Sequence, residues 1–491
     1  MQGARLKASE IAGATAEALR NAGAFAHDVV RPTIRLGVTG LSRAGKTVFI
    51  TALVNNLLDG GRLPFFDAAA QGRLLRAYLE PQPDDDIPRF DYERHLADLT
   101  GNPTSWPQST RRLSQLRITL EFEPASLIGR ALGRDRLHVD IVDYPGEWLL
   151  DLPLLNLSFE DWSRQEVEMS REPGRKAISR SWHKVIDSLD PLHDADEQEA
   201  RKASEYFTSY LRSCRESGDT AIVPPGRFLM PGELEGSPAL TFSPLVLPEA
   251  SNAPSGSLWA MMERRYEAYK NHVVKPFFRD HFARLDRQIV LIDALTAING
   301  GKETIKDFER AISGILKCFR PGANSWLSSI LYRRIDRILF AATKADHLHH
   351  SSHDRLEAIV SRLAHDAIAR SDMAGAEVKV VALAAVRATR EGEARSGGET
   401  LPCIIGKPLA GEKIGTRTFD GTQEYAIFPG DLPESPDQLD AFGGKESSND
   451  QIELVRFRPP DTPPDTQGRL SALPHIRLDR VLNFLVGDRL E

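Results

Sequence analysis

With 491 residues, the chain is long enough for two or three domains, or for one core with large insertions, at the usual size of about 150 residues per domain. Hydrophobic residues make up 41% and charged residues 27%, which is typical of a globular protein and excludes a disordered or fibrous chain. A net charge of −7 argues against binding nucleic acid through the whole surface, so we expect no nucleic acid partner.

The cysteines and the N-terminal sequence indicate a cytoplasmic protein. Cys214, Cys318 and Cys403 lie far apart and form no disulfide or metal-binding pattern, which is typical of a reducing compartment. The N-terminal region lacks the continuous apolar core of a signal peptide. No apolar run approaches the length of about 20 residues that a transmembrane helix needs, so we expect no transmembrane segment, while peripheral contact with a membrane stays open.

In chain order, the first predicted segment is an N-terminal helix. Residues 1–33 contain this helix over positions 5–30, where apolar residues recur near one face. A strand is predicted at Ile34–Thr39, and a helix at Thr47–Leu58 follows a glycine-rich turn. Residues 61–112 are rich in Pro, Asp and Arg, which predicts an extended connection with short helices.

The middle of the chain changes from strands to helices. Strands are predicted at Leu116–Phe122 and Leu137–Val142, and they complete the first part of a core over residues 34–146. Residues 147–286 carry charged, amphipathic stretches and predict a helical insertion. Within this insertion, residues 219–256 are rich in Pro, Gly and Ser and show no clear periodicity.

Three short apolar runs predict the strands of the second part of the core, residues 287–390. These runs are Gln288–Asp293, Arg337–Ala342 and Val378–Ala384. Continuous apolar runs are typical of strands buried on both faces of a parallel sheet, and helical segments lie between them. We therefore predict an α/β fold with a doubly wound, mostly parallel sheet.

The last part of the chain, residues 391–491, is rich in Gly and Pro at first and predicts irregular excursions from the core. One β-like stretch is predicted within it, at Ile452–Phe457. A final amphipathic helix is predicted at Arg477–Leu485, and we expect it to pack on the core.

The strongest motif begins where the first predicted strand ends. Residues 40–47 read Gly-Leu-Ser-Arg-Ala-Gly-Lys-Thr and match the P-loop pattern GxxxxGK[ST]. The glycines let backbone N–H groups face phosphate oxygens at a helix N-terminus. Lys46 is expected to reach the β- and γ-phosphates, and the Thr47 hydroxyl to bind Mg²⁺. The predicted phosphate contacts in this segment are Gly40, Ser42, Arg43, Ala44, Gly45, Lys46, Thr47 and Val48.

A second motif follows the strand at 137–142 and reads Asp143-Tyr-Pro-Gly146-Glu147. Asp143 can hold magnesium through water, and the Gly146 N–H can approach a γ-phosphate, so the pattern resembles the DxxG of GTPase switch II. Glu147 stands where many small GTPases carry a glutamine that orients water, and we count it as a catalytic candidate. A side chain that faces solvent is the competing interpretation of Glu147.

A third motif, Thr343-Lys344-Ala345-Asp346, follows the strand predicted at 337–342 and indicates a guanine base. The carboxylate of Asp346 can accept hydrogen bonds from guanine N1–H and from its exocyclic amine, two donors that adenine does not present in this arrangement. The motif resembles the N/TKxD motif of GTPases, which implies that Thr343 and Lys344 also contact or support the base. By its position, the segment with Ala384 and Ala385 corresponds to the SAx loop of GTPases.

These motifs occur together with two further segments, Ser-Trp-Pro-Gln-Ser-Thr-Arg-Arg at 105–112 and Leu-Pro-His-Ile-Arg-Leu-Asp-Arg at 473–480. As a set they resemble the YcjX-like family, which are stress-associated bacterial P-loop proteins with a GTPase core and a helical insertion. The resemblance covers most of the chain and implies nucleotide binding and nucleotide-dependent switching.

Two further candidates depend on position alone. Thr110 precedes the strand at 116–122 and is our candidate for the switch I magnesium ligand, although a plain loop hydroxyl would look the same. Arg43 lies inside the P-loop at a position similar to the internal arginine of guanylate-binding proteins, which implies an arginine finger acting when a partner or a dimer closes the site. A surface salt bridge is the alternative role for Arg43, and Arg111 and Arg112 are alternative fingers.

Four histidines follow the third motif: His347, His349, His350 and His353. His349 and His353 would share a face of a helix. No carboxylate or cysteine in this segment completes a metal site, so a solvated segment is the preferred interpretation.

Together the motifs predict a Mg²⁺-dependent GTPase that binds GTP and GDP, hydrolyses GTP slowly and acts as a conformational switch. The helical insertion follows switch II directly, and we expect a protein effector to contact it. One alternative is an ATPase or a small-molecule kinase of the P-loop class. Another is a scaffold gated by nucleotide binding, with negligible hydrolysis.

Overall fold

The computed structural model describes most of the chain. The described residues are 32–40, 44–108, 112–126, 130, 135–217, 224–247, 253–317, 335–365, 368–369, 375–396, 399–441, 452, 454–462 and 472–491. The helix predicted over 5–30 lies outside them, and so do Ser42, Arg43, Thr110 and Arg111.

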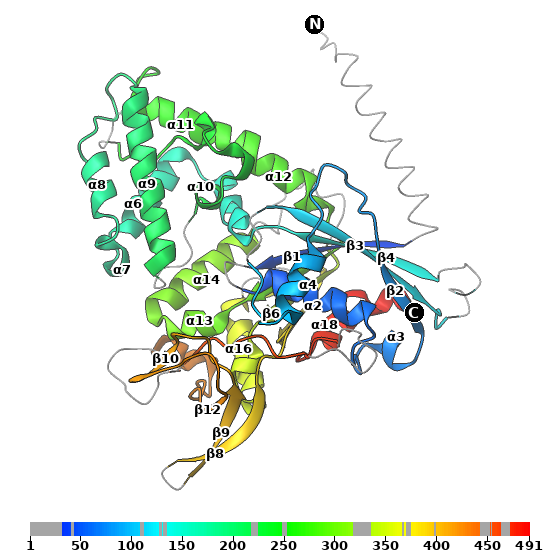
Figure 1. The fold of residues 1–491 in the computed structure, drawn as a ribbon. Coiled ribbons are helices and arrows are strands. Elements are labelled where there is room, and N and C mark those ends of the chain that lie inside the picture. Colours follow the sequence, from blue (N-terminus) through cyan, green and yellow to red (C-terminus); the bar gives the residue numbers. More distant parts are fainter. Residues whose placement is uncertain are drawn as a thin grey trace, which may run out of the picture.

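A seven-stranded sheet forms the centre of the molecule, in the order β2-β3-β4-β1-β5-β6-β7 (Figure 1). Its strands are β1 (Thr33–Gly40), β2 (Leu74–Glu80), β3 (Ser114–Phe122), β4 (Arg136–Asp143), β5 (Arg287–Ile292), β6 (Arg337–Ala342) and β7 (Glu377–Ala382). The five strands from β4 to β7 in this order run parallel, whereas β2 and β3 add an antiparallel edge. The predicted α/β fold with a mostly parallel sheet is therefore confirmed.

The edge strand β2 corrects one prediction. We expected residues 61–112 to be a connection, but the segment also contributes β2, between the helices α3 (Asp67–Ala70) and α4 (Tyr92–Thr100). The residues of β2 are mostly half-buried or exposed, so the strand lacks the continuous apolar run by which a buried strand is recognised.

Helices cover both faces of the sheet, because alternate residues of each buried strand point to opposite sides. In β5, Ile289 and Leu291 pack with α2 (Lys46–Leu58), α4 and the C-terminal helix α18 (Leu478–Val486). Val290 and Ile292 pack on the other side, with α13 (Ala294–Asn299), α14 (Lys302–Lys317) and α16 (His353–Leu363). The expectation that the last helix packs on the core is thus met.

The segment after β4 is helical, as expected. Its elements are η1 (Gly146–Asn156), α6 (Phe159–Ser170), α7 (Pro173–Lys176), α8 (Arg180–Ile186), α9 (Glu197–Ser217), α10 (Gly226–Leu229), η2 (Gly232–Leu234), η3 (Pro238–Leu240), α11 (Leu258–Tyr269), the π-helical turn η4 (Lys270–Val274), α12 (Lys275–Asp280) and η5 (Phe282–Arg284). Aromatic side chains fill its interior. Trp162 stacks on Tyr266 at 5.0 Å and Trp182 on Tyr210 at 5.2 Å between ring centroids. This interior continues without a break into the core on the α14 face of the sheet.

The C-terminal part corrects a second prediction. It contains a three-stranded antiparallel sheet, β12-β9-β8, built from β8 (Arg390–Ser396), β9 (Glu399–Gly406) and β12 (Tyr425–Ile427), and a short pair, β10 (Lys413–Ile414) and β11 (Arg417–Thr418). The strand predicted at Ile452–Phe457 is wrong. Among its described residues, only Phe457 forms a single bridge, to Pro408, while Val455 and Phe457 are buried in a small cluster against the new sheet.

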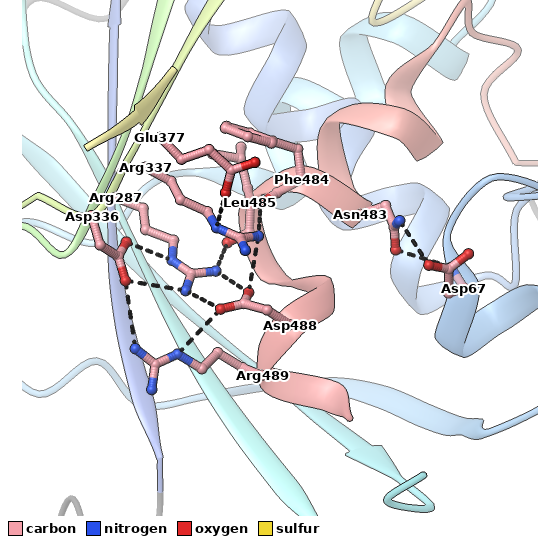
Figure 2. Close-up of polar contacts among 10 residues, drawn as sticks. All are labelled: Asp67, Arg287, Asp336, Arg337, Glu377, Asn483, Phe484, Leu485, Asp488 and Arg489. Carbon is pink, nitrogen blue, oxygen red and sulfur yellow. Dashed lines mark hydrogen bonds and ion pairs between the residues drawn. The ribbon is translucent and has the colours of Figure 1, made fainter. Parts of the chain in front are cut away.

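The amino ends of β5 and β6 are tied to the C-terminal helix by charged side chains (Figure 2). Arg287, the first residue of β5, has no exposed side-chain surface. Its guanidinium lies 3.1 Å from Asp336 and 2.5 Å from Asp488, and it also donates to the Leu485 carbonyl. Because one buried cation meets two carboxylates and a carbonyl, the end of the chain is fixed to the start of the sheet.

A second arginine repeats this connection one strand further along. Arg337, the first residue of β6, donates to the Phe484 carbonyl at 2.6 Å and lies 3.2 Å from the carboxylate of Glu377. On the opposite side of the same helix, Asn483 donates to the Asp67 carboxylate at 2.9 Å (Figure 2).

Within the described residues, every helix is too short or too polar to span a lipid bilayer.

Candidate nucleotide-binding site

The three sequence motifs meet at one edge of the sheet, where the carboxyl ends of the parallel strands lie level. In the strand register, Val38 pairs with Asp143 and Gly40 with Leu291. Ile292 pairs with Ala342, so Asp293 and Thr343 leave their strands side by side. Ligands of open α/β sheets bind outside this edge, and here it carries the P-loop, Asp143 and the Thr-Lys-Ala-Asp segment.

Two glycines make the P-loop turn possible. A Cβ on Gly40 would lie 2.8 Å from the Leu291 carbonyl oxygen and 3.0 Å from the Ala44 Cβ, closer than side-chain carbons approach. Gly45 has φ 85°, in the left-handed region that favours glycine, and it caps the N-terminus of α2. The amino group of Lys46 donates to the Gly40 carbonyl at 3.0 Å, so the lysine folds against its own loop.

The donor set on either side of the loop suits a magnesium ion. Thr47 is buried in the first turn of α2, and Asp143 is buried at the last position of β4. A hydroxyl and a carboxylate are the hard oxygen ligands that Mg²⁺ prefers. Gly146 begins η1 three residues after Asp143, and Val48 packs partly buried against the α2 face of the core.

The residues predicted to hold the base are fixed by partners that sequence reasoning missed. Lys344 has φ 62°, and its amino group lies 2.5 Å from the Asp293 carboxylate. Asp293 is the last residue of the predicted strand Gln288–Asp293 and directly follows β5, so a polar residue at that strand end was a signal for it. Thr343 is buried, and both its amide and its hydroxyl donate to the Ile292 carbonyl, at 2.9 and 3.3 Å.

Asp346 is buried, with 5% of its surface exposed, and it is held by the chain that leads into β8. Its Oδ2 accepts a hydrogen bond from the Ala388 amide at 2.9 Å, while the Thr389 hydroxyl donates to the Asp346 carbonyl at 2.5 Å. A carboxylate has about four lone-pair sites, so this orientation leaves capacity for two further donors.

The SAx-like segment is paired with the C-terminal segment. The Ala384 amide donates to the Ile476 carbonyl at 3.2 Å, and the Ile476 amide donates back to Ala384 at 2.8 Å. The Ala384 N–H is therefore engaged, and of the two predicted residues Ala385 is the better candidate to meet a base. Nothing in the local sequence pointed to Ile476, which lies more than ninety positions away.

Glu147 is buried, with 6% of its surface exposed, so the interpretation that it faces solvent is wrong. Its carboxylate lies 3.2 Å from the Arg215 guanidinium at the end of α9. The backbone of Glu147 is also covered, because a Cβ on Gly226 would lie 1.9 Å from the Glu147 carbonyl oxygen. The residue after the DxxG motif is thus packed into the helical insertion on two sides.

The next turn of η1 extends this contact. Asp151 is buried and accepts hydrogen bonds from the Gly226 amide at 2.6 Å and the Tyr269 hydroxyl at 2.7 Å. Burial raises the pKa of Asp151 to about 6, although these hydrogen bonds act in the opposite direction. The guanidinium of Arg227 lies 3.3 Å from the centroid of the Trp148 ring, a cation–π contact.

Comparisons with known proteins agree with the motifs. The model of the YcjX-like family, DUF463, matches residues 34–490. A relative from Escherichia coli (strain K12), named Ras-like GTPase YcjX, is 38% identical over 468 residues, which cover 93% of this chain and 96% of the relative. A relative of the same name from Shewanella oneidensis is 34% identical over 478 residues, which cover 93% of this chain and 95% of the relative.

Proposed function

The chain belongs to the YcjX-like family, and on that premise we propose that it binds guanine nucleotides, hydrolyses GTP with Mg²⁺ and changes conformation with the nucleotide state. The relatives named Ras-like GTPase support this proposal. The observation that carries it is the meeting of the P-loop, Asp143 and Asp346 at one edge of a parallel sheet. We also carry over from the family resemblance a role in the stress response.

In this proposal, base selectivity comes from Asp346. Its carboxylate is oriented by the Ala388 amide and accepts from guanine N1–H and the exocyclic amine. The stem of Lys344, anchored by Asp293 at 2.5 Å, lies along the base. The Ala385 amide donates to the guanine oxygen.

The phosphates are bound by the P-loop backbone and Lys46, which exchanges the Gly40 carbonyl for phosphate oxygens. Thr47 and Thr110 would hold the magnesium ion directly, and Asp143 would hold it through water. When bound, the ion neutralises charge on the phosphates. The Gly146 amide donates to the γ-phosphate and so senses whether it is present.

For hydrolysis, water attacks the γ-phosphorus in line with the leaving oxygen, and the chain must orient that water and offset the developing charge. We assign the orientation of the water to Glu147, whose negative charge is compensated by Arg215 at 3.2 Å. We propose that Arg43 acts as an arginine finger and offsets the charge that develops on the phosphate. Arg43→Ala should slow single-turnover hydrolysis and leave GTP affinity nearly unchanged; an unaltered rate would remove this role.

The contacts of Glu147 and Asp151 with α9 and α10 support a route from the γ-phosphate to the insertion. We propose that the insertion, residues 147–286, rearranges with nucleotide state, so that η1 shifts against α9 and α10, and presents a surface to a protein effector, or to a second copy of the chain. The described cysteines, Cys214 and Cys403, are buried thiols outside any disulfide, which suits a cytoplasmic location.

The main test compares GTP, ATP and XTP binding to the wild type and to Asp346→Asn. The wild type should prefer GTP over ATP. In the variant, GTP affinity should fall by about tenfold to a hundredfold, since hydrogen bonds to a charged group are lost, and XTP affinity should rise. Asp354→Asn is a matched control, because Asp354 lies nearby and 90% of its side chain is exposed.

The outcomes separate the alternatives. Equal binding of GTP and ATP, unaffected by Asp346→Asn, would favour an ATPase or a small-molecule kinase. Selective GTP binding without phosphate release, even at saturating Mg²⁺, would favour a scaffold gated by nucleotide. No binding of any nucleotide by the wild type would overturn the proposal as a whole, and Lys46→Ala provides the background level for each measurement.

A further inference from the structure

The histidines after Asp346 are arranged differently from the sequence expectation. His353, the first residue of α16, is buried, and its Nε2 lies 2.8 Å from the Ala345 carbonyl oxygen. His353 therefore supports the segment Thr343–Asp346, which is proposed to bind the base, and does not share a surface with His349. The interpretation of the whole segment as solvated is wrong for His353.

A carboxylate from another part of the chain joins the two remaining histidines. Glu391, at the start of β8, lies 2.8 Å from the Nδ1 of His350, although 41 positions separate them. The rings of His349 and His350 lie 4.2 Å apart between centroids. One ligand atom from each of these three residues lies within 4.8 Å of the other two.

We propose that His349, His350 and Glu391 bind a zinc ion. Two imidazoles and one carboxylate, with water in a fourth position, are a ligand set that zinc uses, whereas magnesium and calcium prefer oxygen ligands alone. Ligand atoms at about 2.0–2.2 Å from a tetrahedral zinc lie roughly 3.3–3.6 Å apart. The atoms that now lie up to 4.8 Å apart must therefore approach, while the His350 Nδ1 and the Glu391 carboxylate oxygen, now 2.8 Å apart, must separate slightly. The side chains can do so, because that of His350 is 66% exposed and that of Glu391 29%.

Three existing contacts of the ligands with other residues compete with the ion. The Nδ1 of His349 lies 2.9 Å from the Ser351 hydroxyl and accepts from the Ser351 amide at 3.4 Å, and the Arg387 guanidinium lies 3.8 Å from the Glu391 carboxylate. All three are exposed or half-buried and of modest strength, so a metal–ligand bond can replace them. We therefore expect reversible zinc binding with a dissociation constant of roughly micromolar order. We do not expect zinc to be required for folding.

The position of the site gives it a consequence for nucleotide binding, which rests on the proposed function. Ala388 and Thr389, which hold Asp346, lie three and two positions before Glu391, and His349 lies three positions after Asp346. A zinc ion would join these two segments directly. The carboxylate of Asp346 would then be held more firmly, and release of a bound guanine nucleotide should slow.

The first experiment measures zinc binding without nucleotide. The full chain, freed of any histidine tag and treated with a chelator, is titrated with zinc chloride in a calorimeter. One ion should bind per chain, and His350→Ala and Glu391→Gln should each weaken binding at least about tenfold. His193→Ala and Glu205→Gln, which change exposed side chains in the helical insertion, should leave it unchanged. Binding that ignores both ligand substitutions, or no binding at millimolar zinc, would overturn the site.

The second experiment follows release of a fluorescent GDP analogue with and without zinc. Release should slow severalfold in the wild type and not in Glu391→Gln. If zinc binds through the named residues but release is unaltered, the effect on Asp346 is overturned while the site stands. If no guanine nucleotide binds at all, the proposed function fails, and the zinc titration still decides the metal site.

Discussion

At their amino ends, strands β5 and β6 begin with Arg287 and Arg337, whereas at their carboxyl ends the same strands lead into the polar residues Asp293 and Thr343 of the candidate nucleotide site. Each of the two arginines makes several charged contacts, which include Asp488 in η9 (Gly487–Leu490) and a backbone carbonyl of α18 (Figure 2). The carboxyl ends are held by close backbone turns and by single polar contacts, such as that of Lys46 with Gly40. One end of the sheet is thus built to stay in place, and the other offers contacts that a ligand can exchange.

The amino end shows what a buried charge requires. A buried guanidinium is costly unless it is fully paired, and Arg287 meets two carboxylates and a carbonyl. Burial alone would raise the pKa of Asp488, but the hydrogen bonds and charge of Arg287 outweigh burial and hold it below the ordinary value. The stability that the network contributes therefore depends mainly on its buried cation, Arg287.

Removing Arg287 should have the largest effect on stability. Arg287→Ala leaves Asp336, Asp488 and the Leu485 carbonyl without their shared partner. Loss of one partner from a fully buried pair costs about 3–5 kcal/mol, and because Asp336 is 45% and Asp488 29% exposed, we expect about 2–3 kcal/mol. Urea unfolding measures the loss. Arg489→Ala is the matched control, because its side chain is 50% exposed and its contacts with the same carboxylates are 3.6 and 3.7 Å long, so it should cost less than about 1 kcal/mol. Equal effects of the two substitutions would contradict the distinction between a buried and an exposed partner.

A second buried ionisable group, inside the helical insertion, lacks such pairing. Glu166 on α6 is fully buried, and its Oε2 has no hydrogen-bond partner within the described residues. Burial raises the pKa of Glu166 to about 8, against smaller opposite effects of Arg175 and Trp162. The folded chain therefore keeps a proton that the unfolded chain loses near pH 4.5, so stability decreases as the pH rises from there toward 8.

Glu166→Gln should remove this dependence. Relative to the wild type, the free energy of unfolding of the variant should rise by up to about 1.4 kcal/mol per pH unit between pH 6 and 8. Urea unfolding at pH 6, 7 and 8 measures the difference in unfolding free energy between variant and wild type. The slope of this difference against pH is the readout. Glu168→Gln, an exposed position on the same helix, should give parallel curves. A difference that stays constant with pH would show that Glu166 ionises normally.

A substitution at Gly40 tests the close backbone turn at the carboxyl end of β1. Gly40→Ala forces a Cβ against the Leu291 carbonyl and the Ala44 Cβ, which should cost about 1–3 kcal/mol and weaken nucleotide binding, because the P-loop must shift. Gly256→Ala is the control, since a Cβ there meets nothing within 4 Å. Unfolding in urea and nucleotide titration give the two effects. Unchanged nucleotide affinity in Gly40→Ala would mean that the loop does not depend on this close approach.

The elements that the sequence predicted well are those specified locally. The parallel strands are continuous apolar runs, and β6 begins and ends at the predicted residues, Arg337 and Ala342. The P-loop was found because eight consecutive residues carry its chemistry. By contrast, β8 reads Arg-Glu-Gly-Glu-Ala-Arg-Ser and carries no strand signal of its own; it is a strand because β9 pairs with it.

The contacts that orient the site were not predictable, because the fold brings them together across long stretches of chain. Arg215 reaches Glu147 over 68 positions, and Ala388 reaches Asp346 over 42. An arginine on a charged amphipathic helix looks like any solvated side chain until the helix is placed. Motif residues can therefore be named from sequence, while the groups that set their geometry need the structure.

The contact of Glu147 with Arg215 should give the smallest effect on stability and the most direct information on switching. Arg215→Ala leaves a buried carboxylate without this partner and should cost about 1 kcal/mol, because the arginine is 29% exposed. Arg212→Ala, an exposed position on the same helix, should cost almost nothing.

A double-mutant cycle with Glu147→Gln and Arg215→Ala, measured by thermal unfolding, gives the coupling energy of the pair in GDP and in a non-hydrolysable GTP analogue. If Gly146 moves to the γ-phosphate, Glu147 must move with it, since the two are adjacent, and the contact of 3.2 Å must lengthen or shorten. The coupling energy should then differ between the two nucleotide states. Equal coupling in both would mean that the insertion does not follow the γ-phosphate through this pair, and that the carboxyl end of the sheet is as fixed as the amino end.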